Sequence, residues 1–359
     1  MSEAGNPAFT NILWLVTPVL TPFIRGVQVE QTLLQCELAS ARLRMAVAAS
    51  AWRDLGGTNC FVEGVADSIA RAGDLSRTGI CVIPKFAGDL PLAAWLDALN
   101  VVKRKGLRLV IDICDYPFRS DKGAVPAFYK TALTLADAVV VNSVRMAEQM
   151  TPHFGKPVTV IEDAVLGEPA APRFAPAARL NLLWFGHPSN LRFLEPWIRT
   201  LIEQGPKPCR LTVVTQEGFG VREAAASLSA QLAPSSASFE MVFVEWSLAA
   251  TQRELERCDI AILPSDPADL RKSGASANRL AEVLQAGRFA VASPLQSYLA
   301  LSHGAWVGDN LLDGLKWSLA NREAVAARIQ AGQQRVREKY AMNAIGRQWL
   351  EFFAELGER

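Results

Sequence analysis

Short apolar runs alternate with longer segments of helical periodicity along the whole chain. In the first half, runs rich in Val, Ile and Leu predict buried strands at 12–16, 43–48, 80–83, 107–113, 138–141 and 158–161. In the second half, the same pattern predicts strands at 180–185, 210–214, 240–244, 260–263 and 289–292. Near-continuous apolar strands separated by helices are typical of parallel sheets with helices on both faces. The pattern therefore predicts an α/β fold in both halves.

The two halves are separated by a stretch in which the periodicity stops. Three prolines and several alanines interrupt every pattern between residues 167 and 179. A chain of 359 residues also exceeds the size at which one hydrophobic core keeps growing. We therefore expect an N-terminal Rossmann-like domain over residues 1–168 and a second one over residues 180–340.

The last segment, residues 341–359, has helical periodicity. Ile345, Trp349, Phe352 and Phe353 lie along one face of the predicted helix, and this apolar face needs a partner. The pattern is equally consistent with packing back across the cleft onto the first domain and with packing on the helix's own domain.

Charge and composition exclude several classes of protein. The chain has 37 Lys and Arg and 36 Asp and Glu, so a net charge of +1 predicts no nucleic-acid partner. The six cysteines are scattered singly, which indicates buried reduced thiols. No apolar run approaches the length of about 18 residues that a spanning helix needs, and the first ten residues do not resemble a signal peptide. We expect a cytoplasmic protein, with peripheral contact at the inner face of the membrane left open.

Most short motifs with a defined chemistry are missing from the sequence. It has no P-loop, no His-Glu-x-x-His, no Gly-x-Ser-x-Gly and no Asp-x-Asp pair. Its three histidines, at 153, 187 and 303, are too far apart in sequence to suggest a local metal site. We therefore expect neither a metal nor a cofactor. The pair of glycines in Gly218-Phe219-Gly220 lacks the third glycine of a dinucleotide motif and predicts a turn.

The most informative stretch, residues 264–298, follows a predicted buried strand. Its loop leads into a helix that begins near Asn278 and ends at Gly287. Small residues before a helix N-terminus expose backbone N–H groups, and that end has a partial charge of about +0.5, which suits phosphate. Lys272 and Arg279 add the charge that would hold a diphosphate and stabilise it as it leaves, without a metal. The other predicted phosphate contacts are Ser273, Gly274, Ser276 and Asn278.

Glu282 lies one helical turn after Asn278. A carboxylate at this position can accept hydrogen bonds from two adjacent hydroxyls, as a ribose would offer. The alternative is that Glu282 is a solvated helix residue and Lys272 a loop charge, and spacing alone slightly favours that alternative.

This stretch resembles the C-terminal domain of family 4 glycosyltransferases, also called glycosyl transferases group 1. Pro264-Ser265 and residues 282–293 match the family's Pro-Ser and its Glu-Ala-x-Ala-x-Gly-x-Pro-Val-Val-Ala-Ser motif. The resemblance extends to residues 135–150, 158–165 and 180–186, in the same order as in the family. It implies an α/β protein of GT-B architecture, in which two Rossmann-like, doubly wound parallel-sheet domains face a cleft.

One residue departs from the family pattern. The family has two glutamates separated by seven residues, and Gly274 stands where the first glutamate, which contacts the donor sugar, is expected. Because of this departure, the sequence does not identify the donor sugar, and a protein without catalytic activity stays an alternative.

Further site residues follow from strand ends and from the resemblance. Loops after the first strand of each Rossmann unit should face the ligand, which places Gly26 in the first domain and Gly186 with His187 in the second. Trp246 follows the strand that approaches the nucleotide base in relatives. Its ring would either stack on the base or pack within the protein. For Gly26, a surface loop without a ligand is an equally good reading.

Two aspartates lie at the end of the predicted strand over 107–113. Asp112 suits a structural role, whereas Asp115 should lie closer to the cleft and could contact the acceptor or act as a base. An inverting transfer needs such a base and a retaining one does not, and the resemblance favours retention.

The sequence therefore predicts a metal-independent glycosyltransferase that moves a sugar from a nucleoside-diphosphate sugar to a hydroxyl acceptor. The acceptor would be a glycan, a lipid-linked molecule or a protein, in bacterial glycan or glycoconjugate assembly. Two alternatives stay open. One is a non-catalytic relative that binds nucleotide or glycan as a partner subunit, and the other is a sugar-nucleotide epimerase of similar architecture.

Overall fold

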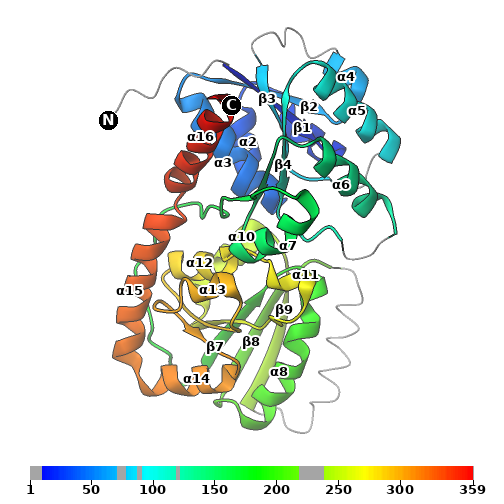
Figure 1. Cartoon of the computed structure of the whole chain (residues 1–359). Helices are drawn as coiled ribbons and strands as arrows, with labels where there is room; N and C mark the ends of the chain where they lie inside the picture. The colour runs from blue at the N-terminus through cyan, green and yellow to red at the C-terminus, as the bar shows by residue number, and fades with distance from the viewer. Residues whose placement is uncertain (1–9, 71–77, 87–90, 119–121, 218–237, 359) are drawn as a thin grey trace. The chain divides into compact units, whose positions relative to one another are not determined.

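The protein divides into two compact units in the computed structural model (Figure 1). Unit 1 comprises Met1–Leu166, Gly274–Ser276 and Tyr340–Arg359, and unit 2 comprises Gly167–Ser273 and Ala277–Lys339. The structure describes residues 10–70, 78–86, 91–118, 122–217 and 238–358. The turn predicted at Gly218-Phe219-Gly220 lies outside the described residues.

Unit 1 is built on a parallel sheet that has six strands among its described residues, in the order β2-β1-β3-β4-β5-β6. The strands are β1 (Asn11–Val16), β2 (Thr58–Glu63), β3 (Thr78–Ile83), β4 (Arg108–Ile113), β5 (Ala138–Val141) and β6 (Thr159–Val160). The helices are η1 (Pro18–Leu20), α1 (Thr21–Ile24), α2 (Val29–Leu34), η2 (Ala41–Met45), α3 (Ala46–Asp54), α4 (Ala66–Ala70), α5 (Leu92–Arg104), α6 (Ala124–Leu135), α7 (Val144–Phe154) and α16 (Met342–Glu358).

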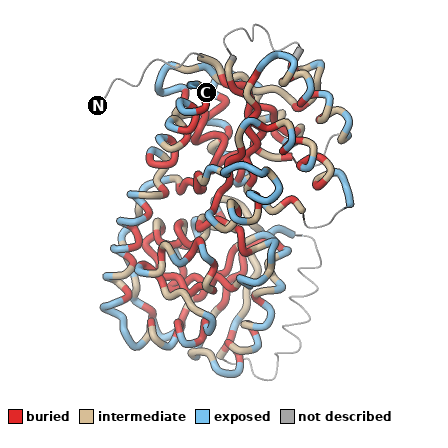
Figure 2. The backbone as a smooth tube through the Cα atoms, in the orientation of Figure 1, coloured by how far each residue is buried: buried red, intermediate tan, exposed pale blue. Residues whose placement is uncertain are grey.

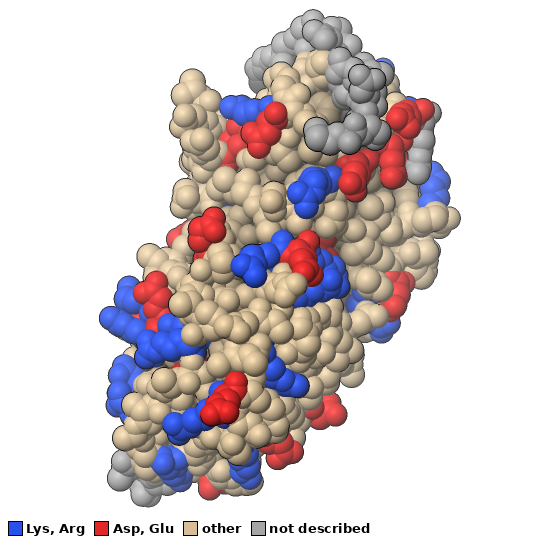
Figure 3. Space-filling model, turned by 90° about the vertical axis from the view of Figure 1, so that its left-hand side faces the viewer, with Lys and Arg blue, Asp and Glu red and all other residues tan. Residues whose placement is uncertain are grey.

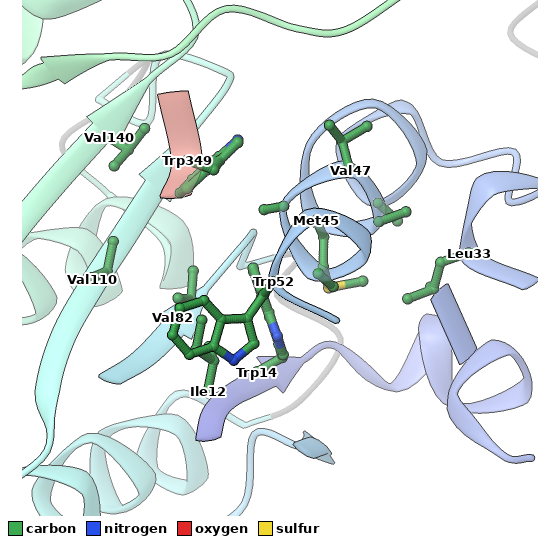
Figure 4. Close-up of a cluster of buried hydrophobic side chains, with 14 of the residues drawn as sticks. Ile12, Trp14, Leu33, Met45, Val47, Trp52, Val82, Val110, Val140 and Trp349 are labelled. Atoms are coloured by element: carbon green, nitrogen blue, oxygen red, sulfur yellow. The ribbon is translucent and has the colours of Figure 1, made fainter. Parts of the chain in front are cut away.

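Alternate residues of the unit 1 strands enter different cores, one on each face of the sheet. In β1, Ile12 and Trp14 join the cluster drawn in Figure 4, whereas Leu13 and Leu15 join the cluster on the opposite face. The period of two in side-chain direction explains this division, because both faces of the sheet are covered by helices. The buried stretches of Figure 2 follow the strands and the inner faces of these helices.

The C-terminal helix α16 belongs to unit 1 and closes one of these cores. Trp349 and Phe353 are buried, and the ring of Phe353 meets those of Trp14 and Trp52 edge to face at 6.4 and 6.0 Å. The backbone N–H of Val165 donates to the carbonyl of Tyr340, just before the helix. The apolar face of this segment is therefore buried within unit 1.

The strand predicted at 43–48 is wrong, because these residues form η2, a π-helical turn, and the start of α3. The structure instead places an edge strand, β2, at Thr58–Glu63, where the pattern predicts none. Every residue from Ala41 to Ala49 is buried, so the run shows no helical amphipathicity. A short apolar run of this kind does not distinguish a strand from a fully buried helix, and the alanines favour the helix.

The buried run includes Arg44, whose side chain is completely inaccessible to solvent. Its guanidinium donates to both carboxylate oxygens of Asp112 at 2.6–3.0 Å, to Asp163 Oδ1 at 2.9 Å and to the carbonyl of Ile161 at 2.6 Å. Burial alone would lower the pKa of the Arg44 guanidinium, but the neighbouring carboxylates raise it above its ordinary value. Arg44 is therefore a permanent buried cation in unit 1, held by three parts of the chain.

Unit 2 has a second parallel sheet with six strands among its described residues, in the order β12-β11-β10-β7-β8-β9. The strands are β7 (Leu180–Phe185), β8 (Cys209–Thr215), β9 (Phe239–Glu245), β10 (Ile260–Leu263), β11 (Phe289–Ala292) and β12 (Trp306–Val307). The helices are η3 (Pro188–Asn190), α8 (Leu191–Gln204), α10 (Leu248–Arg257), α11 (Leu270–Ser273), α12 (Asn278–Gln285), α13 (Gln296–Leu299), α14 (Leu311–Ala320) and α15 (Arg322–Lys339).

The proline-rich stretch 167–179 opens unit 2 and packs against the end of α12. The N–H of Ala170 donates to the carbonyl of Gln285, and the N–H of Arg173 donates to that of Gly287. Gly287 ends the helix as predicted, with φ +67°. A Cβ at this position would lie 2.3 Å from the carbonyl oxygen of Ala171, so both backbone conformation and space require glycine here.

On the face drawn in Figure 3, basic and acidic side chains of the described residues lie next to one another, with wide uncharged areas between them. Such mixing gives this face no broad field of one sign. Among the described helices, none combines the length and hydropathy needed to cross a membrane.

Replacement of Arg44 by Met should destabilise the protein by about 3–5 kcal/mol, because Asp112 and Asp163 would lose the cation that compensates their burial. Equilibrium unfolding in urea measures the change. Arg145→Met is the matched control, since Arg145 pairs with Glu148 on the surface of the same unit and should cost less than about 1 kcal/mol. Equal losses in the two variants would contradict the importance of the buried pair.

Candidate functional site

The strand order of unit 2 defines a switch point between β7 and β10. Along the chain, the order reads 3-2-1-4-5-6, so the connections after β7 and after β10 lead away in opposite directions. In open α/β sheets, ligands bind outside the carboxyl ends of the strands at such a point. The segments that follow β7 and β10 are therefore the first places to look for a site in unit 2.

Arg279 lies at this switch point. Its Nη1 is 3.5 Å from the carbonyl oxygen of Phe185, the last residue of β7. A Cβ at Gly186 would lie 3.3 Å from the same nitrogen, so the glycine gives the guanidinium room to reach the strand end. Among the described residues, no carboxylate forms an ion pair with Arg279. The guanidinium is half-buried and keeps its capacity to bind an anion.

Helix α12 has one buried face and one polar face. Leu280, Ala281, Val283 and Leu284 are buried, whereas Asn278, Arg279 and Glu282 are partly exposed. Residues three and four apart lie on the same side of a helix, so these polar residues share one face at its first turn. The sequence prediction of a helix beginning at Asn278 is confirmed, and its N-terminal end adds partial positive charge beside Arg279.

The loop before α12 contains α11, where Lys272 is half-buried and Ser273 is buried. Asp269 links this loop to α8. Its carboxylate accepts hydrogen bonds from the Arg271 side chain at 3.1–3.2 Å and forms an ion pair with Arg192 on α8. Hydrogen bonding by Arg271 outweighs burial and lowers the pKa of Asp269 to about 2, with a further contribution from the charge of Arg192.

The remaining predicted residues of unit 2 also lie at carboxyl ends of strands. Gly186 directly follows β7, and its carbonyl accepts from Thr215 Oγ1 at 2.8 Å. His187 is exposed, and its Nδ1 accepts from the N–H of Ser189, which caps η3. Trp246 follows β9 and is half-buried, and its backbone N–H donates to the carbonyl of Thr215.

Gly274 and Ser276 are buried in unit 1. The carbonyl of Gly274 accepts from Ser143 Oγ at 2.8 Å, and Ser276 Oγ donates to Asp163 Oδ2 at 2.5 Å. The polar groups of both residues thus have partners inside the protein. Of the residues predicted around the phosphates, Lys272, Ser273, Asn278, Arg279 and Glu282 belong to unit 2.

Unit 1 has its own switch point, between β1 and β3. Gly26 lies in the segment after β1, exposed, with φ +137°. Lys85 follows β3, and its Nζ lies 3.0 Å from Oδ2 of Asp115, which follows β4. Asp115 is 51% exposed, whereas Asp112 is buried against Arg44, in agreement with the structural role expected for it.

Several contacts of these sites cannot be predicted from the sequence. Lys85 pairs with Asp115 across 30 positions, and Asp163 pairs with Ser276 across 113. Spacing along the chain gives no sign of either contact. Arg44 does leave a signal, since an arginine within an apolar run indicates a buried ion pair.

Comparisons with known proteins identify the fold. No protein-family model matches the chain, and no curated protein matches its sequence at a significant level. Among solved structures, HepE from Anabaena in complex with UDP-glucose is similar, with a TM-score of 0.65 over 96% of this chain and 99% of that chain, at 14% identity. TarM gives a TM-score of 0.57 over 77% of this chain and 55% of its own, at 13% identity. OtsA gives 0.52 over 81% and 75%, at 12% identity.

HepE, TarM and OtsA have the GT-B fold. At this level of identity the likeness establishes a shared fold. The predicted architecture of two Rossmann-like parallel-sheet units of the GT-B type is therefore confirmed.

The ion pairs of Asp269 should give stability a pH dependence below neutrality. The folded-state pKa of about 2 lies below the unfolded value of roughly 3.9. The carboxylate therefore contributes its full stabilisation above about pH 5, and this contribution decreases as the pH falls towards 2. Since both arginines are exposed, we expect Asp269→Asn to cost no more than about 1 kcal/mol at pH 7. In urea unfolding, the difference between wild type and variant should be unchanged at pH 5 and smaller at pH 3.5. A difference that stays constant down to pH 3.5 would contradict the lowered pKa.

Proposed function

We propose that this protein is a glycosyltransferase that transfers a sugar from a nucleoside-diphosphate sugar to a hydroxyl group. The proposal takes unit 2 as the donor-binding unit and unit 1 as the acceptor-binding unit. A uridine nucleotide is the preferred donor class, because HepE was solved with UDP-glucose and TarM with UDP, and both share the fold.

Arg279 is the observation that supports the proposal most directly. A guanidinium without an ion-pair partner among the described residues lies at the switch point, on the first turn of α12, where a diphosphate is expected to bind. Arg279 can form two parallel hydrogen bonds to phosphate oxygens, and the helix N-terminus adds partial charge. Lys272 supplies a second cation in the preceding helix.

The other residues follow from these positions. Glu282, on the same face of α12 as Arg279, accepts hydrogen bonds from the ribose hydroxyls. Gly186 gives the Arg279 guanidinium room at the end of β7, where we propose that the phosphate binds, with His187 and Asn278 as further contacts. Trp246 contacts the base. These assignments agree with the resemblance to family 4 glycosyltransferases, which we propose as the closest functional class.

In the proposed reaction the bond between the anomeric carbon and the diphosphate oxygen breaks, and the acceptor oxygen forms the new bond. Arg279 and Lys272 stabilise the charge that develops on the departing diphosphate, a role that needs no metal. In the retaining mechanism that we propose, the leaving phosphate oxygen takes the proton of the acceptor hydroxyl. Asp115, paired with Lys85, orients that hydroxyl in unit 1.

Binding of nucleotides tests the donor assignment. Calorimetric titration of the purified protein with UDP, GDP and ADP, each with and without a chelator, should detect one class that binds, with an affinity that the chelator does not change. Arg279→Ala should weaken that affinity by about 1.5–3 kcal/mol, roughly 10- to 150-fold, because a charged hydrogen bond to phosphate is lost.

Arg253→Ala is the matched control for this titration, since Arg253 is an exposed arginine of the same unit that pairs with Glu254. Its affinity should equal that of the wild type. If no nucleotide binds to the wild type, or if the two arginine variants bind equally well, the donor assignment is incorrect.

Asp115→Asn tests the acceptor side. Asp115 is exposed beyond the carboxyl end of β4, so the substitution should change stability by no more than about 0.5 kcal/mol and leave nucleotide affinity within about twofold of the wild type. Turnover at saturating donor should fall by at least about tenfold, because the acceptor hydroxyl loses the carboxylate that orients it, and misplacement of a reacting group can cost on the order of 10²-fold. Turnover is measured by release of the nucleoside diphosphate. An unchanged rate would remove Asp115 from the mechanism, and NMR of the product's anomeric proton distinguishes retention from inversion.

A further inference from the structure

Two segments leave the sheet of unit 2 at its switch point, and a side-chain contact joins them. Helix α8 and the short η3 follow β7, whereas the loop that contains α11 follows β10. Arg192, in the first turn of α8, forms an ion pair with Asp269, which lies directly before α11. Both residues and both segments belong to unit 2. The ion pair therefore links the chain after β7 to the chain after β10, across 77 positions of the sequence.

Asp269 also holds the backbone of α11. Its Oδ1 accepts from the backbone N–H of Arg271 at 2.8 Å, as a side chain at the N-cap of a helix does. Its carbonyl accepts from the N–H groups of Lys272 and Ser273 at 2.9 and 2.8 Å. Because α11 has only four residues, these bonds involve most of its backbone. The place of the Lys272 main chain therefore follows that of Asp269.

The ion pair is part of a network in which each member has a second contact. The guanidinium of Arg192 lies 4.5 Å from the centre of the Phe193 ring. The side chain of Asp269 is only 13% exposed and also accepts from the side chain of Arg271 at 3.1–3.2 Å. An isolated pair on the surface contributes little, because two mobile side chains must be ordered to form it. Here less order has to be imposed, since the partners are already held by other groups.

We propose that Asp269 and Arg192 are positioning residues, which hold Lys272 at a fixed place relative to the end of β7 so that the site can bind a diphosphate. Asp269 fixes α11, and Arg192 fixes Asp269 to the helix that follows β7. In this role neither residue contacts the ligand. The inference rests on the proposed function, because Lys272 is one of the two cations assigned to the diphosphate.

The sign of one substitution distinguishes this role from simple electrostatics. Asp269→Asn keeps a side-chain oxygen that can cap α11 and removes the charge that pairs with Arg192. Loss of a negative charge near a phosphate site would by itself strengthen the binding of an anion. The positioning role predicts the opposite. In calorimetric titration with UDP, GDP and ADP, the affinity for the nucleotide that binds should be about threefold to tenfold weaker than in the wild type.

Arg192→Met breaks the same contact from α8 and completes a double-mutant cycle. The variant with both substitutions should bind nucleotide no more weakly than the weaker single variant, because each change removes the same link. Amide exchange in residues 268–273, followed by mass spectrometry, should become about fivefold faster in all three variants, while exchange in β8 is unchanged.

Glu240→Gln is the matched control. Glu240 is another carboxylate of unit 2 that pairs with two arginines, Arg179 at 3.0 Å and Arg210 at 3.9 Å, but it lies near the start of β9. This variant should change neither nucleotide affinity nor amide exchange in residues 268–273.

Three results would overturn the proposal. The first is an Asp269→Asn variant that binds nucleotide as tightly as the wild type or more tightly. The second is a double variant in which the effects of the two substitutions add, and the third is unchanged exchange in residues 268–273. If the wild type binds no nucleotide at all, the proposed function fails, and the exchange measurement still decides whether Asp269 and Arg192 hold α11.

Discussion

The guanidinium of Arg44 has no contact with solvent, and its burial constrains much of unit 1. A cation removed from water costs several kcal/mol unless it is paired and hydrogen-bonded. Asp112 at the end of β4, the carbonyl of Ile161 and the carboxylate of Asp163 must therefore all reach it at once. The ring of Trp349, on α16, lies 5.6 Å from the same guanidinium. One side chain thus links η2, the sheet and the C-terminal helix in a single arrangement.

This constraint separates a buried carboxylate from an exposed one at the end of β4. Asp112 lies on the same face of the sheet as Val110, two residues before it, and its carboxylate accepts hydrogen bonds from Arg44. Asp115 lies beyond the strand, where the alternation ends, and meets Lys85 at the surface. Two aspartates only three positions apart therefore have opposite environments. The exposed one pairs with a lysine at the surface, whereas the buried one is part of the core.

Sequence patterns predict unit 2 well and unit 1 less completely, for a physical reason. Strands of unit 2 such as β10 are short apolar runs between clear breaks, and Gly287 marks the end of α12. In unit 1, Ala41–Met45 is buried on every side, so periodicity does not distinguish a helix from a strand. In the candidate site, too, local features can be predicted and distant contacts cannot. Arg279 follows from a local motif, whereas the bond from Ser276 to Asp163 spans 113 residues and depends on tertiary structure.

The arginines near the switch point of unit 2 differ in how their charges are compensated. Asp269 forms ion pairs with two of them, Arg192 and Arg271, and its low pKa keeps its carboxylate ionised at neutral pH. Arg279 contacts a backbone carbonyl at 3.5 Å and has no ion-pair partner among the described residues. The carboxylate of Asp269 therefore occupies part of the hydrogen-bonding capacity of the first two. The charge of Arg279 is therefore the least compensated of the three, and this is the physical basis for proposing Arg279 as the phosphate contact.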